Sequence, residues 1–161
     1  MDWKTATGIP WDILILFGGG LCLSAAFIKS GLAAALGDVL GSIPAIHPLL
    51  ILLAVILVVS FLTEVTSNTA VASLMMPIMA VFGAGSGLNP VILMLAAAFA
   101  SSMAFMMPVA TPPNAIVYGT GRIAMRDMNK AGLTMNFVSA VILLLVVGFL
   151  VPLILGIPIL S

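Results

Sequence analysis

The sequence predicts an all-α integral membrane protein with about three transmembrane helices, an interfacial arm helix, a re-entrant helical hairpin and a helix broken at Pro112-Pro113. The composition indicates an integral membrane protein: 63% of the residues are hydrophobic and 6% are charged, whereas an ordinary soluble domain has about 25% charged residues. Five basic and five acidic residues cancel, so the charge gives no indication of a nucleic-acid partner. The single cysteine, Cys22, excludes an internal disulfide and a multi-cysteine metal site.

The first two predicted elements are a helix over residues 11–28 and an interfacial helix over residues 30–42. The first contains Gly18-Gly19-Gly20, which permits close helix contact. No cleavage site follows it convincingly, so we expect a retained helix and not a signal peptide. The second is less apolar, and its leucines recur at helical spacing, which is typical of a helix lying at the membrane surface.

Residues 49–82 predict the re-entrant hairpin. Two apolar arms, 49–62 and 70–82, flank the polar segment 63–69. As helices the arms measure about 21 Å and 20 Å, while the hydrocarbon core of a bilayer is about 30 Å thick. One long helix would place the polar segment in hydrocarbon, whereas a hairpin places a non-helical tip where it can line a cavity.

The broken helix is predicted over residues 88–120. We expect a crossing from Val91 to about Val109, an interruption at 110–114 and a restart near Asn114. Two successive prolines remove two amide donors and disfavour helical geometry in the residues before them. The last transmembrane helix is predicted over residues 132–151.

Basic residues indicate the orientation. Lys4, Arg122, Arg126 and Lys130 fall on one side of the membrane if the chain crosses three times and enters once as a hairpin, and Lys29 falls on the other. Because basic residues favour the cytoplasm, we expect a cytoplasmic N-terminus, an external C-terminus and a hairpin that enters from outside.

The two interruptions, 63–69 and 110–114, are the candidate binding site. Ser60, Thr63 and Ser67 are spaced i, i+3, i+7, so their hydroxyls share a helix face. Hydroxyl and amide oxygens beside the carbonyl end of a half-helix suit a hard cation such as sodium, while the amide end of the next half-helix attracts an anion. Neither interruption contains Arg, Lys or His. Co-bound cations would therefore offset the cost of holding an anion there.

Glu64 leaves two interpretations open. It is either a proton or cation ligand, or a structural carboxylate bonded to nearby amides, and the second is slightly favoured. The sequence contains no Ser-Lys, Asp-Asp or His-Glu-x-x-His constellation, so we predict that the chain is not an enzyme such as an intramembrane protease.

Three ordered motifs, at residues 11–23, 61–69 and 108–117, resemble the C-terminal half of the divalent anion/sodium symporter family. The resemblance implies one half of an inverted repeat, an elevator mechanism and no cofactor beyond the coupling ion, sodium. It also implies a bacterial inner-membrane carrier of dicarboxylates, of tricarboxylates or of sulfate, in a homodimer.

The resemblance also implies site residues. The sodium ligands would be Thr63, Ser67, Asn68 and the backbone of Ala110. The substrate ligands would be Asn68, Thr69, Thr111 and Pro112. The family's first-half hairpin has no counterpart in this sequence, so one copy supplies half of the substrate cradle.

We therefore expect a partial transporter whose partners are sodium, a small anion, membrane lipids and an N-terminal half or a second copy. The alternatives are a subunit of a split carrier and a non-transporting membrane fragment. Two copies in opposite orientations are disfavoured by the consistent basic bias. The identity of the anion, and sodium versus proton coupling, stay open at this point.

Overall fold

The computed structural model describes residues 47–160 and eleven isolated positions before them. Those positions are Trp3, Thr7, Ile15, Gly18, Gly19, Cys22, Ala25, Ala26 and residues 29–31. The helix expected over 11–28 and the arm helix expected over 30–42 lie, apart from these positions, outside the described residues.

The described region is helical throughout its core. Its elements are α4 (Pro48–Thr63), α5 (Asn68–Ser86), α6 (Pro90–Ala100), α7 (Pro112–Gly119), α8 (Met125–Leu145), a π-helical turn (Val146–Leu150) and α9 (Val151–Leu155). Within the described residues no β-strand forms, and one isolated bridge joins Leu88 to Leu160. The prediction of an all-α fold is confirmed for this part of the chain.

Three of these helices begin in the same way, with a polar N-cap residue followed by proline. His47 Nδ1 accepts the amide of Leu49 at 3.3 Å, and Asn89 Oδ1 accepts the amide of Val91 at 3.0 Å. Thr111 Oγ1 accepts an amide in the same way at the start of α7. The side chain satisfies an otherwise unpaired amide, and proline at the first helical position removes another.

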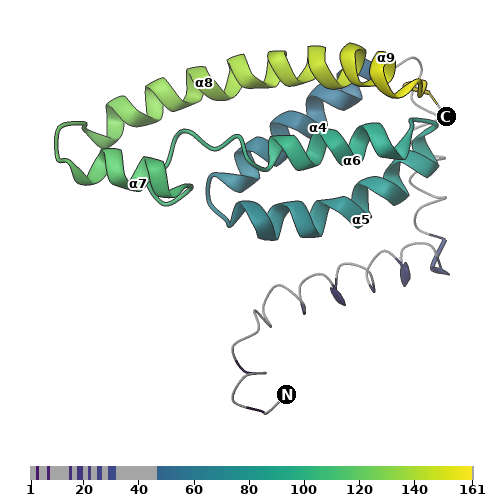
Figure 1. Cartoon of the computed structure of the whole chain (residues 1–161), viewed down its shortest axis with the longest axis horizontal. Coiled ribbons are helices and arrows are strands. Elements are labelled where there is room, and N and C mark those ends of the chain that lie inside the picture. Colours follow the sequence, from purple (N-terminus) through teal and green to yellow (C-terminus); the bar gives the residue numbers. More distant parts are fainter. Residues whose placement is uncertain are drawn as a thin grey trace.

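The helices form a bundle in which α6 is the central element. α5 packs mainly against α6, while α4 packs against α8 and α6. In Figure 1, α8 and α9 run along one edge, α5 along the opposite edge and α6 between them. The best-buried side chains of the main hydrophobic cluster come from α4, α6 and α8 and the turn after it: Leu52, Ile56, Val59, Ile92, Leu93, Ala96, Ala97, Ala100, Ala140 and Val147.

The two arms of the hairpin, α4 and α5, make little contact along their lengths. An apolar crevice of about 590 Å³ separates them, lined by side chains such as Ile51, Val55 and Ile78. The hairpin is therefore open, and each arm is held by α6 or α8 more than by the other arm.

The observed arms are longer than the sequence predicted. α5 runs four residues past Phe82, into the segment expected to be a turn, and Gly87 ends it in a left-handed conformation. At 19 residues it measures about 28 Å. The sequence argument that neither arm is long enough to cross a bilayer therefore does not hold for α5, which is long and apolar enough for a membrane span.

The helix expected from Val91 to about Val109 is wrong beyond Ala100. α6 ends there, and residues 101–111 form an irregular segment. Pro112 and Pro113 open α7; they do not break a helix already in progress. The physical reason lies in Glu64, which binds the backbone amides that a continuing helix would have used.

The last helix begins at Met125 and not near Gly132, and it continues to Leu155. The basic segment before the expected span is thus helical and carries Asp127 in its first turn, where a negative charge favours the helix dipole. A π-helical turn occupies Val146–Leu150, just before Pro152. Because proline has no amide hydrogen, a regular α-helix here would leave the carbonyl four residues before it without a donor.

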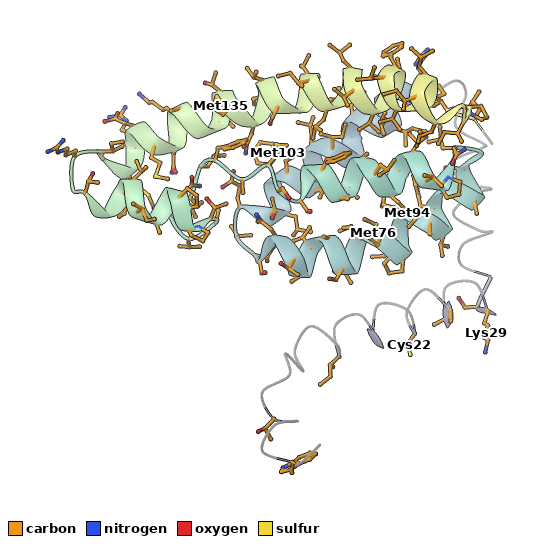
Figure 2. All side chains as sticks on the ribbon, in the orientation of Figure 1. Cys22, Lys29, Met76, Met94, Met103 and Met135 are labelled. Atoms are coloured by element: carbon orange, nitrogen blue, oxygen red, sulfur yellow. The ribbon has the colours of Figure 1, made fainter. Side chains whose placement is uncertain are left out.

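Beyond its first turns, which carry the exposed Arg126, Asp127 and Lys130, the rod formed by α8, the π turn and α9 presents a largely hydrocarbon outer surface (Figure 2). Phe137, Val141, Leu145 and Phe149 are each about half exposed there, and Leu153 is 80% exposed. Over 31 residues this rod is long and apolar enough to cross a membrane. Such a surface suits contact with lipid acyl chains.

Neighbouring valines on α4 test this packing. Both valines line the crevice, but Val59 is 1% exposed and packed in the core, whereas Val58 is 62% exposed. Val59→Ala should lower the free energy of unfolding by about 1–3 kcal/mol, because the cavity left behind is not refilled. Val58→Ala should change it by less than about 0.5 kcal/mol. Thermal unfolding in detergent micelles measures both, and equal shifts would contradict the assigned core.

Candidate functional site

Three oxygens meet where the hairpin turn approaches the end of α6. The hydroxyl of Thr63 lies 2.5 Å from Asn68 Oδ1 and 2.7 Å from the carbonyl oxygen of Ser101. Thr63 is the last residue of α4 and is fully buried, and Asn68 is the first residue of α5. The turn 64–67 therefore brings the two halves of the hairpin onto one carbonyl of the irregular segment.

The oxygen cluster combines three kinds of oxygen ligand: a hydroxyl, a side-chain amide oxygen and a backbone carbonyl. Hard cations prefer oxygen ligands of these kinds, so the donor set fits an ion of the sodium type.

Ser60 extends the same face of α4, one turn before Thr63. Its hydroxyl donates to the carbonyl of Ala100 at 3.5 Å and is buried. The predicted shared face is therefore observed for Ser60 and Thr63. Ser67 does not continue it, because the helix ends before it; Ser67 is exposed and caps α5 without a side-chain hydrogen bond.

The start of α5 is correspondingly open. Thr69 is exposed and Asn68 is half-buried, and the carbonyl of Ser67 accepts the amide of Val71 at 2.9 Å. Because no side chain caps this helix, its first amides stay available to a ligand. The first amides of a helix favour negative charge.

Glu64 lies next to the oxygen cluster and is 3% exposed. Its Oε1 accepts the amides of Phe105 at 2.8 Å and Met106 at 3.0 Å, while Oε2 accepts those of Met106 and Met107, both at 3.0 Å. Of the two interpretations left open by the sequence, this geometry matches the structural carboxylate bonded to amides.

A fourth donor reaches Glu64 from α8. Asn136 Nδ2 donates to Oε1 at 2.8 Å, and the Asn136 side chain is completely buried. One turn earlier, Gly132 lies against the backbone of Phe105 and Met106, leaving no room for a methyl group. Gly132, Asn136 and Ala140 therefore form a small-residue face on which the irregular segment and α4 rest.

The second predicted interruption is ordered by its own contacts. Asn114 Nδ2 donates to the carbonyls of Ala104 and Met107, both at 3.0 Å. Ala110 is buried and its amide donates to Met107 at 3.2 Å. Pro112 is exposed and Thr111 half-exposed. Over residues 47–160 no hydrogen bond joins Ala110, Thr111 or Pro112 to the hairpin turn, although both regions lie toward the same end of the bundle (Figure 1).

A second hollow, of about 490 Å³, opens beside α7 and the first turns of α8. Its lining includes Phe105, Asn114, Arg122 and Asp127. The basic side chain of Arg122 therefore lines the same hollow as Asn114 of the second interruption. The sequence alone did not predict that these two residues share a hollow. Asp127 supplies a balancing negative charge in the same hollow.

Discontinuous helices in an apolar all-α bundle, with oxygen ligands at a helix break, are features found in ion-coupled secondary transporters. The chain belongs to the family described as the sodium:sulfate symporter transmembrane region, which matches residues 1–156. It is accordingly an integral membrane protein, and its relatives are symporters and not enzymes.

Two curated relatives have the name sodium-dependent dicarboxylate transporter SdcS. The protein from Staphylococcus saprophyticus is 48% identical over 157 residues, which are 98% of this chain and 30% of that protein. The protein from Staphylococcus aureus strain MRSA252 is 46% identical over 159 residues, 99% of this chain and 31% of that protein. The chain therefore spans about a third of the length of these relatives.

Sequence reasoning missed three members of the site: the Ser101 carbonyl, Gly132 and Asn136. The backbone carbonyl has no sequence signal of its own. The other two had one, because Gly132, Asn136 and Ala140 recur every four residues, a spacing that places small and polar residues on one helix face.

Gly132 offers a direct test of the docking between α8 and the irregular segment. A methyl group in Gly132→Ala would lie 2.5 Å from Met106 Cα, so the segment must move. We expect a loss of about 1–3 kcal/mol in the free energy of unfolding. Gly119→Ala is the matched control, since a methyl group there has nothing within 4 Å. Denaturant titration should separate the two variants, and indistinguishable midpoints would contradict the close approach.

Proposed function

We propose that the chain forms part of a sodium-coupled secondary transporter of dicarboxylates or tricarboxylates, such as succinate and citrate, or of sulfate. The observation that carries the proposal is the oxygen cluster of Thr63, Asn68 and Ser101, placed directly beside the uncapped start of α5. A cation site and an anion site would then share Asn68.

The cation site is proposed to include Thr63 Oγ1, Asn68 Oδ1 and the Ser101 carbonyl. Ser67 and the backbone of Ala110 are further candidate ligands, which the family resemblance implies. The structure supports the first three by their mutual distances of 2.5 and 2.7 Å. A sodium ion with these ligands would add positive charge beside the first amides of α5.

The anion is proposed to bind at Asn68 and Thr69, with Thr111 and Pro112 approaching from the irregular segment and α7. The free amides at the start of α5 favour a carboxylate or sulfate oxygen. Because neither interruption holds a basic side chain, the bound sodium would balance part of the anion's charge. Binding the cation first would therefore strengthen anion binding.

We further propose that α4 and α5 enter the bilayer as a re-entrant hairpin, that the carrier lies in a bacterial inner membrane and that it moves by an elevator mechanism as a homodimer. The hairpin proposal is supported by the 16-residue length of α4, about 24 Å, and by the polar turn 64–67. An N-terminal half or a second copy would supply the remaining substrate ligands.

The second candidate function is that of a non-transporting fragment or a subunit of a split carrier. One copy of the chain would supply only half of the proposed substrate ligands, which favours it. Proteoliposomes distinguish the candidates. We expect sodium-driven succinate uptake when the chain is reconstituted with the N-terminal two thirds of the S. saprophyticus relative. Uptake by the chain alone would show an autonomous carrier, and uptake without a sodium gradient in either preparation would overturn the proposal.

Thr63→Val tests the cation site within such a carrier. The substitution removes the hydroxyl between Asn68 and Ser101 and keeps the side-chain shape. We expect the half-saturating sodium concentration to rise about tenfold, equivalent to about 1.4 kcal/mol of binding free energy. Thr66→Val is the control, because the Thr66 hydroxyl donates only to Leu62 within the turn. Equal sodium requirements in the two variants would exclude Thr63 as a ligand.

A further inference from the structure

We propose that Glu64 is a positioning residue for the cation site: it fixes the irregular segment 101–111 to the hairpin turn and so sets the affinity for sodium without touching the ion. The inference rests on the proposed function for its sodium readout, and on the structure alone for its geometry.

The first step concerns how far the acceptor positions of the Glu64 carboxylate are already occupied. Both carboxylate oxygens are used, and every partner within the described part of the chain is a donor: the amides of Phe105, Met106 and Met107, and the side-chain nitrogen of Asn136. A carboxylate accepts through two oxygens and about four lone-pair positions. This shell therefore leaves Glu64 little capacity to serve as a ligand for an ion as well.

The second step is what the amides would do without Glu64. In a continuous helix each of them would donate to the carbonyl four residues earlier. α6 instead stops at Ala100, so the carbonyl of Ser101 is released from the helical ladder and accepts from Thr63 at 2.7 Å. By binding the amides of 105–107, Glu64 holds the segment in the form that presents this carbonyl.

The third step is the covalent link. Glu64 follows Thr63 directly, so one turn of chain carries both the hydroxyl of the oxygen cluster and the carboxylate that anchors the opposing segment. Asn136 and the close approach at Gly132 then attach this junction to α8. A shift of the segment would change the distance between Thr63 and Ser101 and therefore the geometry offered to a cation.

The following substitutions distinguish a positioning role of Glu64 from a role in stabilising the fold alone. Glu64→Gln keeps the side-chain length but replaces one carboxylate oxygen by an NH2 group. That group cannot accept hydrogen bonds from the backbone amides that it would face. Glu64→Asp keeps two acceptor oxygens on a shorter stem. Asn136→Ala removes one donor and leaves the three amides bound to Glu64, so it serves as the milder second variant. Asp127→Asn is the matched control for loss of one negative charge, because Asp127 is exposed at the start of α8.

The first measurement is amide hydrogen–deuterium exchange of the purified chain in sodium-free detergent buffer. In Glu64→Gln we expect exchange at Phe105, Met106 and Met107 to accelerate at least about tenfold, with α8 amides beyond Val141 unchanged. Glu64→Asp should recover part of the protection, and Asp127→Asn should match the unmodified chain. Unchanged exchange at these three amides in Glu64→Gln would overturn the proposal. If that variant does not fold, Glu64→Asp decides instead: exchange at these three amides no faster than in the unmodified chain would overturn the proposal.

The second measurement is the sodium concentration that half-protects segment 101–111 against exchange, with choline as the comparison ion. We expect the midpoint to rise about tenfold in Glu64→Gln and about threefold in Asn136→Ala. A residue that only stabilised the fold would lower the unfolding temperature and leave this midpoint in place, and that result would overturn the positioning role. If the unmodified chain shows no sodium response, the proposed function fails, and the exchange rates in sodium-free buffer still decide the anchoring.

Discussion

One buried carboxylate organises the described part of this protein. Glu64 gathers three consecutive backbone amides and the Asn136 side chain, and that arrangement is incompatible with a helix running through residues 105–107. The end of α6 at Ala100, the irregular segment 101–111 and the docking of that segment on α8 all follow from it. A buried carboxylate is costly unless hydrogen bonds replace its water, so the segment and Glu64 depend on each other.

The same physics explains why non-helical backbone is tolerated among apolar helices. In a bilayer interior, an unpaired amide or carbonyl costs several kcal/mol. Here the carbonyls at the end of α6 accept from Ser60 and Thr63, and those of Ala104 and Met107 accept from Asn114. The polar residues that looked like a binding motif in the sequence therefore have two tasks. They satisfy the broken backbone, and at Thr63 they group oxygen ligands that suit a hard cation.

Hydropathy and a polar interruption are local signals, and they predicted the helical class and a turn within 63–69. The grouping of Thr63 with Asn68 was implied by the family resemblance. The prediction failed at the end of α6, since residues 101–109 have the apolar composition of a helix and only the distant Glu64 draws their amides away. The prediction also begins the last helix too late, at residue 132, because charged residues such as Arg126 and Lys130 precede the apolar run although they lie within α8. The Ser101 carbonyl could not be assigned to the site, because its contact with Thr63 is long-range. The spacing of Asn136 marks a helix face, but not its distant partner Glu64.

The central claim is that the hairpin turn and the segment after α6 jointly build a cation site. Experimental structures of the complete carrier, determined in sodium and in choline at a resolution that shows ions, test it most directly. The account predicts density in sodium alone, coordinated by Thr63 Oγ1, Asn68 Oδ1 and the Ser101 carbonyl, with Glu64 still bound to the amides of 105–107. An ion placed elsewhere, or an ion held directly by Glu64, would contradict it.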